Sequence, residues 1–202
     1  MERNDAIIKL KQLENVDLVP LARKYDVTIW KGEKKNKGWA GHVLERYLGL
    51  PINSAQSPKF GSWELKLVPL KLLVNGTIVV KETMAITMID PFNVKATQFE
   101  ESHLLAKLKK AVVCARLFES QEEKRSILMR VVAFNLDNRT LYEQVKKDYE
   151  ETRSCIIENG FDCLTGRMGV LVQPRTKGSG HGSISRAFYA RTQFVATILG
   201  IK

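Results

Sequence analysis

The sequence predicts a single α/β domain, and three observations support this fold class. The chain has 202 residues, of which 44% are hydrophobic, so it can bury a core sufficient for one domain. Residues 63–89 are rich in Val, Ile, Leu and Thr, as strands are, whereas residues 140–159 carry the charged pattern of a long helix. Neither an internal repeat nor a low-complexity tract divides the chain, so we expect residues 1–202 to fold as one unit.

The N-terminal part is expected to be helical. Apolar residues at helical spacing predict short helices over residues 5–15, capped by Asn4 or Asp5, and over residues 17–22. A third helix, over residues 39–48, has one apolar face and ends at a glycine that a proline soon follows.

The middle of the chain is expected to form most of the strands. Residues 63–89 are interpreted as three consecutive strands, and the Asn75-Gly76 pair within them is the strongest hairpin signal in the chain. Two further apolar runs, residues 111–118 and 127–134, predict two more strands, and residues 99–110 between these groups are expected to be helical.

The C-terminal part is expected to mix helix, strand and loop. The long helix over residues 140–159 should end at Gly160, and residues 168–172 read as a short strand. A glycine-rich loop over residues 173–183 follows, and a helix over residues 188–199 closes the chain.

The charge of the chain predicts an anionic partner. Lys and Arg outnumber Asp and Glu by 32 to 22, which gives a net charge of +10 and an isoelectric point near 9.6. The basic residues gather in the run 31–37 and in two stretches without any acid, residues 103–116 and the segment after Asp162. A solvated basic face would explain any one of these stretches, but all three together favour phosphate binding.

The cysteines and the hydropathy pattern favour a cytoplasmic protein. Cys114, Cys155 and Cys163 are odd in number and lack metal-ligand spacing, so neither a full disulfide framework nor a structural zinc site is expected. No apolar run reaches the roughly 20 residues of a membrane span, and the N-terminus lacks the apolar core of a signal peptide.

Glu64 and Lys66 are the first candidates for chemistry. On a strand, residues two apart face the same side, so this carboxylate and this ammonium should lie together. The carboxylate can bind Mg²⁺, while the ammonium can orient a water and offset charge on a phosphate. The plain alternative is a pair of solvated charges on an amphipathic strand. Of the histidines, His42 is expected to serve at the surface or in packing, and His103 to cap a helix.

Residues 37–45, Lys-Gly-Trp-Ala-Gly-His-Val-Leu-Glu, followed about twenty residues later by Glu64-Leu65-Lys66, resemble the MutH mismatch-repair endonucleases and their restriction-enzyme relatives of the PD-(D/E)xK superfamily. The resemblance implies a restriction-endonuclease-like fold, a central mixed β-sheet flanked by helices, and Mg²⁺-dependent cleavage of double-stranded DNA. It also implies that Glu45 and Glu64 bind the metal and that Lys66 positions the attacking water.

Three later segments carry the same resemblance. Residues 101–109 are similar to the family's ETSHxxxKLK segment, which puts Lys107 near the active site, and residues 174–178 and 186–189 are similar to its base-reading loop and its RxFY segment. The DNA contacts that the resemblance implies are Lys37, Gly38, Arg175, Thr176, Lys177, Arg186 and Tyr189. The chain then divides into N-terminal helices (1–30), a catalytic core (36–134) and a basic DNA-reading part (163–202).

One departure from the family pattern concerns the metal site. The family places an aspartate before the catalytic strand, whereas this chain has Lys59 by context, or Ser57 by distance from Glu64. A lysine there removes a ligand and adds a positive charge near the metal, a repulsion of several kcal/mol at intermediate dielectric. A loss of about 5 kcal/mol would slow cleavage by thousands, so we expect an inactive or weakened nuclease in which only Glu45 or Glu82 could compensate.

The leading interpretation is therefore a sequence-specific endonuclease of the type II restriction or MutH kind, acting on a short palindromic site, where two copies can pair by symmetry. The alternative is a catalytically silent DNA-binding module with the same fold. A basic RNA-binding domain is a third possibility, but the aromatic stacking motifs of common RNA-binding modules are missing from the sequence.

Overall fold

A computed structural model describes residues 1–49, 62–178 and 184–201. The helices are α1 (Arg3–Lys11), α2 (Leu18–Lys24), α3 (Trp39–Tyr47), α4 (Pro91–Ala96), α5 (His103–Leu108), α6 (Arg139–Asn159) and α7 (Thr192–Leu199), with short 3-10 turns η1 (Phe99–Glu101) and η2 (Phe161–Cys163). The strands are β1 (Trp30–Lys31), β2 (Lys34–Lys35), β3 (Glu64–Leu72), β4 (Ile78–Val80), β5 (Met84–Met88), β6 (Lys110–Leu117), β7 (Leu128–Asn135), β8 (Val172–Thr176) and β9 (Arg186–Ala190).

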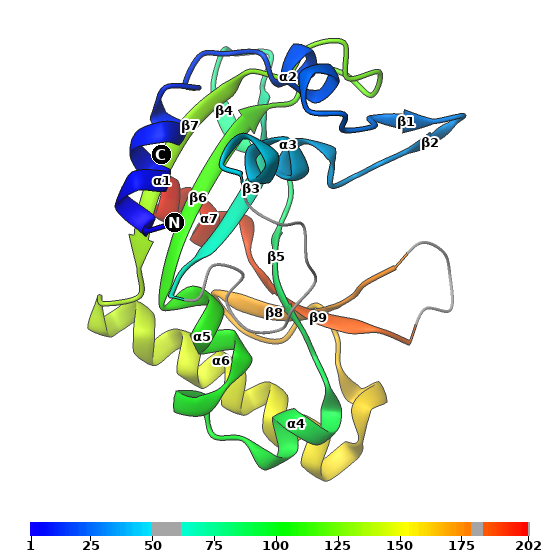
Figure 1. Ribbon diagram of the computed structural model, residues 1–202. Helices are drawn as coiled ribbons and strands as arrows, with labels where there is room; N and C mark the ends of the chain where they lie inside the picture. The colour runs from blue at the N-terminus through cyan, green and yellow to red at the C-terminus, as the bar shows by residue number, and fades with distance from the viewer. Residues whose placement is uncertain (50–61, 179–183, 202) are drawn as a thin grey trace.

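The architecture is α/β, with a curled mixed sheet between helices, as the sequence predicts (Figure 1). The larger sheet has the strand order β4-β3-β6-β7, in which β3 and β6 are parallel and the other neighbours antiparallel. The smaller sheet, β5-β9-β8, is antiparallel. Strand β5 follows β4 directly in the chain but pairs in the smaller sheet, so it links the two sheets.

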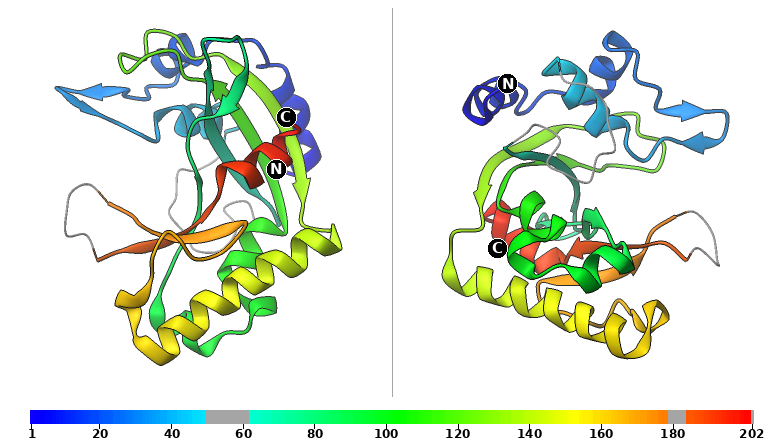
Figure 2. Two further views of the ribbon diagram at one scale, coloured as in Figure 1. Left: turned by 180° about the vertical axis from the view of Figure 1, so that it is seen from behind. Right: turned by 60° about the horizontal axis from the view of Figure 1, so that its bottom comes forward.

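Strand β6 separates two hydrophobic cores because its successive side chains point to opposite faces. Val112 and Cys114 pack with the N-terminal helices, whereas Ala111, Val113 and Ala115 pack with α5, α7 and the smaller sheet. The two further views show α1 to α3 on one side of the larger sheet and α5, α6 and α7 on the other (Figure 2). The fold is therefore a restriction-endonuclease-like arrangement, with a central sheet covered on both faces.

The predicted hairpin at Asn75-Gly76 is confirmed. Gly76 has a φ of 82°, in the left-handed region that glycine tolerates, and the Thr77 amide donates to Asn75 Oδ1 at 3.0 Å. The two strands predicted over residues 111–118 and 127–134 also form, as β6 and β7. The long helix ends at Gly160, as expected.

Two predictions for the C-terminal part are wrong. Residues 168–171 do not form a strand; β8 begins at Val172 and includes Pro174, which an edge strand tolerates because one side of it needs no amide donor. The last helix begins at Thr192 rather than at residue 188, because Arg186–Ala190 is strand β9. A short apolar run does not distinguish a buried strand from a helix by its periodicity.

The expected helix caps are also corrected. Helix α1 begins at Arg3 after Glu2, which makes no side-chain capping bond, so neither Asn4 nor Asp5 is its cap. The helix expected over residues 99–110 is split into η1 and α5. Ser102, not His103, caps α5: its hydroxyl accepts from the Leu105 amide at 3.1 Å.

A tight loop over residues 165–171 fixes the start of β8 against helix α6. The buried carboxylate of Asp148 on α6 accepts hydrogen bonds from the amides of residues 170, 171 and 172, at 2.7 to 2.8 Å. Arg191 donates to the carbonyls of residues 166 to 169 from the other side. Gly169 has a φ of 72°, and a Cβ there would lie 1.8 Å from the Val172 carbonyl oxygen.

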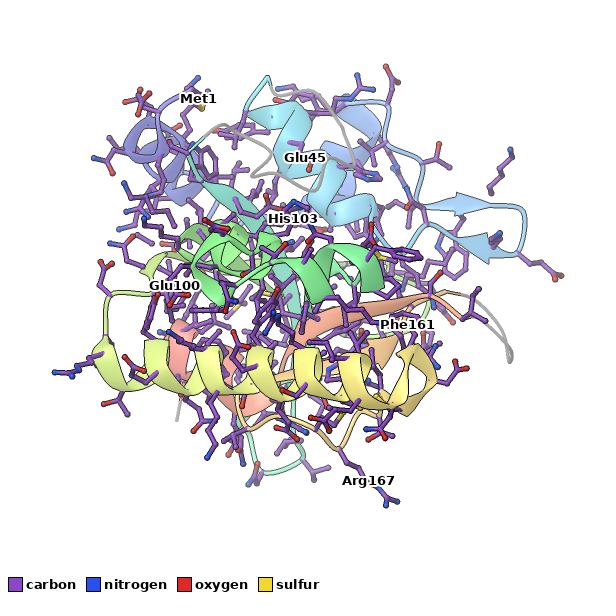
Figure 3. All side chains as sticks on the ribbon, turned by 90° about the horizontal axis from the view of Figure 1, so that it is seen from below. Met1, Glu45, Glu100, His103, Phe161 and Arg167 are labelled. Atoms are coloured by element: carbon purple, nitrogen blue, oxygen red, sulfur yellow. A yellow bond between two sulfur atoms is a disulfide. The ribbon has the colours of Figure 1, made fainter. Side chains whose placement is uncertain are left out.

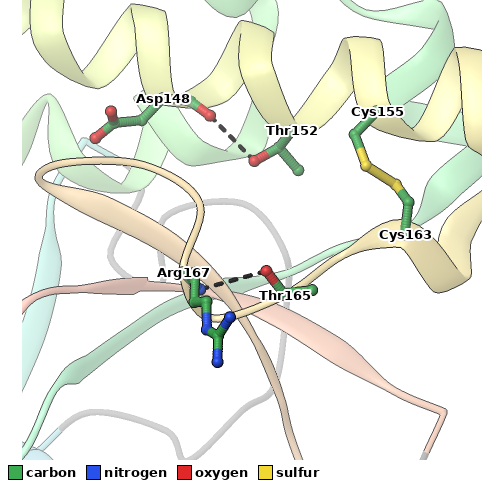
Figure 4. The surroundings of a disulfide bond; sticks show 6 residues. All are labelled: Asp148, Thr152, Cys155, Cys163, Thr165 and Arg167. Atoms are coloured by element: carbon green, nitrogen blue, oxygen red, sulfur yellow. Dashed lines mark hydrogen bonds between the residues drawn. A yellow bond between two sulfur atoms is a disulfide. The ribbon is translucent and has the colours of Figure 1, made fainter.

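One disulfide joins Cys155 at the end of α6 to Cys163 in η2 (Figure 4). The spacing of the cysteines did not predict this bond, and a single bond is not a full disulfide framework. Cys114 is a buried free thiol, and burial raises its pKa. No helix in the described part of the chain is both long and apolar enough to span a membrane.

Candidate active site

The buried carboxylate of Glu64 is the centre of the candidate site. Glu64 is the first residue of β3, next to Ala111 of the parallel strand β6, and its side chain is fully buried. Two lysines approach its Oε1 atom: Lys66 Nζ lies at 3.1 Å and Lys107 Nζ at 3.5 Å. The alternation expected along the strand thus brings Glu64 and Lys66 together, and helix α5 adds a second ammonium from outside the sheet.

Lys66 is held by a backbone irregularity in β5. Its ammonium also donates to the carbonyl oxygen of Ile86 at 3.0 Å. The pairing of β5 with β9 shifts register between Ala85 and Thr87, so Ile86 lies at the irregularity itself. Bulges of this kind reorient backbone groups beside active sites, and here one presents a carbonyl to the lysine. The smaller sheet therefore helps to position Lys66.

Lys107 reaches Glu64 from helix α5, and one face of this helix is apolar and packs into the core. Leu104 and Leu108 are almost fully buried in the core, and Lys107 itself is only 6% exposed. Ser102 fixes the start of the helix, since its hydroxyl also donates to the Phe99 carbonyl at 2.7 Å. Figure 3 shows helix α5, which begins at the labelled His103, and helix α3, which carries the labelled Glu45.

Glu45 and Glu64 line one pocket of about 500 Å³. Val43 and Leu44 of α3 are fully buried in the core, which leaves Glu45, 4% exposed, to line the pocket. His42 also lines the pocket, which differs from the surface or packing role expected for it. Residues three apart on a helix lie on the same side, so His42 and Glu45 share a face.

Lys37 and Gly38 form part of the pocket wall just before α3. A Cβ on Gly38 would lie 3.3 Å from two ring atoms of His42, which is tighter than ordinary contact, so the close approach of this backbone to the ring favours glycine. Asn36 closes the turn: its Oδ1 accepts from the Gly38 amide at 3.1 Å and its Nδ2 donates to the Thr28 carbonyl at 3.0 Å.

The donor set of this pocket is suited to Mg²⁺. Glu45 and Glu64 supply carboxylate oxygens, and Mg²⁺ in proteins is commonly bound by one or two carboxylates with waters and substrate phosphates. Across residues 1–49, 62–178 and 184–201, no group of three or more His, Cys, Asp or Glu side chains is arranged to hold a metal. Lys59 and Ser57, the alternative positions of the family's aspartate, lie outside the described residues.

Arg175 and Tyr189 come together at the edge of this pocket. They lie on the adjacent strands β8 and β9, and the Arg175 guanidinium is 5.9 Å from the centre of the Tyr189 ring. Arg175 also donates to the hydroxyl of Thr83, a pocket residue, at 3.0 Å. Burial raises the pKa of Tyr189 against the opposing effect of Arg175, so the phenol stays protonated at neutral pH.

The other expected DNA-binding residues lie farther along the same hairpin of β8 and β9, toward its turn, and do not line the pocket. Thr176 pairs with Arg186, and the Lys177 amide donates to the Ser185 carbonyl at 2.9 Å. The Arg186 guanidinium donates to the carbonyl of Ile184 at 3.1 Å and lies 5.9 Å from the centre of the Phe161 ring. The structure thus divides the expected DNA contacts between the pocket and this hairpin.

Several pocket residues were not identified from the sequence. Glu82 was considered, but nothing in the sequence placed it near Glu64; it lines the pocket, although its side chain is 59% exposed and pairs with Lys81 at 2.6 Å. Arg116 and Glu123 form a buried ion pair at 2.8 Å in the pocket wall. Glu123 lies in a loop with three glutamates, so no sequence pattern distinguished the buried one.

Two family models match the chain. The model of the DNA mismatch repair enzyme MutH matches residues 48–148, and that of the MvaI/BcnI restriction endonuclease family matches residues 7–84. Together these matches include α3, β3 and α5, the elements that carry Glu45, Glu64, Lys66 and Lys107.

Individual relatives match over nearly the whole chain. The DNA mismatch repair protein MutH of Vibrio campbellii is 26% identical over 210 residues, covering 95% of this chain and 90% of that protein. The MutH protein of Haemophilus ducreyi is 24% identical over 96% of this chain and 92% of its own length. That of Haemophilus influenzae, strain PittEE, is 27% identical over 89% of this chain and 86% of its own length.

Proposed function

The chain belongs to the MutH family of DNA mismatch repair enzymes, and on this basis we propose that it is a site-specific endonuclease that hydrolyses double-stranded DNA with Mg²⁺. The observation that carries the proposal is the arrangement of Glu64 with Lys66 and Lys107 in a pocket that also contains Glu45. A buried carboxylate with two ammonium groups beside an open pocket suits a reaction in which negative charge builds up on a phosphate.

The residues of the pocket have separate roles in this proposal. Glu45 and Glu64 would hold the ion, which when bound supplies a Lewis acid for the phosphate and lowers the pKa of a water. Lys66, fixed by the Ile86 carbonyl, would orient the attacking water and donate a hydrogen bond to a phosphate oxygen. Lys107, whose ammonium lies 3.5 Å from Glu64 Oε1, would offset negative charge on the phosphate.

The DNA would extend from this pocket over the basic surfaces beside it. Lys37, Gly38, Arg175 and Tyr189 lie close enough to the pocket to contact DNA near the scissile phosphate. Thr176, Lys177 and Arg186 would contact it farther along, from the hairpin of β8 and β9. We propose a short palindromic site, on which two copies of the chain would act by two-fold symmetry.

Lys59 lowers the activity in this proposal. A lysine in place of an acidic ligand leaves Glu45 and Glu64 as the carboxylates for the ion and adds a repelling charge. The same residue favours a second candidate function, a silent DNA-binding module of the same fold. That module would bind duplex DNA in a salt-dependent and metal-independent manner.

Cleavage by the natural chain and by Lys59→Asp separates the two functions. Unmethylated phage DNA is incubated with each protein in Mg²⁺ or Mn²⁺, and the products are separated on a gel. Discrete fragments from Lys59→Asp, at a rate at least a hundredfold above the natural chain, would support an endonuclease weakened at one ligand. Absence of cleavage by both proteins, with salt-dependent duplex binding retained, would instead support the silent module.

A further inference from the structure

Strands β1 and β2 form a two-stranded hairpin, residues 30–35, that makes a sheet of its own and stands out from the domain; we call it the β1–β2 arm. All views show it projecting from the same side of the molecule as the hairpin of β8 and β9 (Figures 1 and 2). The pocket lies at the base of both: Lys35 and Lys37 line it from the arm side, and Thr83, the partner of Arg175, lines it from the other.

One face of the arm is attached to the body of the protein. Trp30 and Lys35 are cross-strand partners and so lie on the same face. The Trp30 indole donates to the Glu122 carbonyl at 3.4 Å, and Lys35 Nζ lies 2.5 Å from the Glu123 carboxylate. The ammonium of Lys35 is also 5.3 Å from the centre of the Phe118 ring.

The anchor of the arm is a buried network of charges. Both Glu123 oxygens accept from Arg116, at 2.8 and 2.9 Å, and Arg116 also donates to the Ser126 hydroxyl at 2.7 Å. The Arg116 guanidinium lies 5.3 Å from the centre of the Trp39 ring, at the start of the helix that carries Glu45. Bidentate pairs of this kind fix geometry, so the arm has a defined direction relative to the pocket.

The opposite face of the arm is free of these attachments and basic. Lys31 and Lys34 are cross-strand partners on that face, and both are exposed. Only Glu33, in the turn, opposes their charge within the arm. Two adjacent ammonium groups on a fixed strand pair suit the phosphate backbone of a duplex, whose charges are closely and regularly spaced.

We propose that the β1–β2 arm is a DNA-contacting arm that binds backbone phosphates flanking the cleavage site through Lys31 and Lys34, while Lys35 attaches the arm to Glu123. The inference rests on the proposed function, because it takes duplex DNA as the occupant of the pocket. It assigns two phosphate contacts to the arm, which lies across the pocket from the hairpin of β8 and β9, so the two hairpins would hold the duplex from both sides.

The test compares the double variant Lys31→Gln and Lys34→Gln with a control of equal charge, Lys9→Gln and Lys11→Gln. Lys9 and Lys11 are exposed on α1, on the far side of the molecule from the arm (Figure 1). Binding of a mixed-sequence duplex is measured by fluorescence anisotropy in EDTA over a series of KCl concentrations. We expect the slope of log K against log salt to fall by about 1.8 in the arm variant, at about 0.9 per phosphate contact, and to change little in the control.

Each outcome has one meaning. If the two double variants changed the salt slope equally, or if the arm variant did not change it, the proposed phosphate contacts of the arm would be overturned. The endonuclease proposal would stay intact. If the natural chain itself fails to bind duplex DNA with a steep salt dependence, both proposals fail. Urea unfolding of each variant checks that the exposed substitutions leave the fold unchanged.

Discussion

At the scale of single residues, the site depends on Glu64, because its carboxylate lies within 3.5 Å of two ammonium groups and is fully buried. Glu64→Gln keeps the shape of the side chain but removes the charge that pairs with them. In the Lys59→Asp background we expect this change to reduce the rate of DNA cleavage at least a thousandfold, because it removes the charge of a proposed metal ligand.

Glu82→Gln is the matched control, since Glu82 is an exposed acid that lines the same pocket. We expect it to change the cleavage rate less than tenfold. Comparable losses for the two variants, measured as single-turnover rates, would instead show that Glu82 is as important to cleavage as Glu64.

At the scale of elements, the loop over residues 165–171 positions β8 and therefore Arg175. Gly169→Ala would place a Cβ 1.8 Å from the Val172 carbonyl oxygen, at a residue whose φ is positive, so the backbone of this loop would have to move. We expect a loss of about 3 kcal/mol or more in the free energy of unfolding, measured with urea. Gly41→Ala, in helix α3, has nothing within 4 Å of its Cβ, and should instead stabilise the protein by up to about 1 kcal/mol. Equal effects would contradict the steric argument.

The anchor of the β1–β2 arm should respond to acid. Burial acts to raise the pKa of Glu123, but hydrogen bonds from Arg116 and Lys35 outweigh it and hold the pKa below its ordinary value of 4.5. A lowered pKa in the folded state contributes stability above pH 4.5, and this contribution is lost as the pH falls through the lowered pKa.

We therefore expect the stability of the natural chain to decrease below about pH 4.5 more steeply than that of Glu123→Gln. At neutral pH the variant should be less stable by about 3 kcal/mol, because Arg116 stays buried without its counter-charge. Urea unfolding between about pH 3 and pH 7 measures both effects. If the free energies of unfolding of the two proteins changed in parallel with pH, the assignment of a lowered pKa to Glu123 would be refuted.

At the scale of the whole molecule, the two cores meet at β6, whose Cys114 is fully buried and is the one free cysteine of the three. Burial raises its pKa, which further reduces the reactive thiolate. The native, unreduced chain should therefore give no reaction with a thiol reagent over minutes, and one equivalent on unfolding. Rapid labelling of the native protein would contradict the packing of β6 between the two cores.

How much of this could be predicted from the sequence depends on the range of the interactions. The helices over residues 39–48 and 140–159, the Asn75-Gly76 hairpin and the pairing of Glu64 with Lys66 follow from local periodicity and turn chemistry, and they are predicted correctly. Strand β9 was missed because it pairs with β5, which is distant in the sequence, and the disulfide was missed because the spacing of the cysteines does not mark it. For the same reason the burial of Glu123 could not be recognised, since it requires Arg116 on another element.

The bulge in β5 connects strand β9, which carries Tyr189, to the carbonyl that holds Lys66, and under the proposed function this connection has a consequence. Ala85 pairs with Tyr189, and the next residue, Ile86, gives its carbonyl to Lys66. If β9 shifts when Tyr189 contacts DNA, Ala85 would shift with it. The carbonyl of the next residue, Ile86, would then move the Lys66 ammonium beside Glu64. A correct sequence and a wrong one would differ in how well that lysine is aligned, so that fidelity would be expressed as a rate of cleavage as well as an affinity.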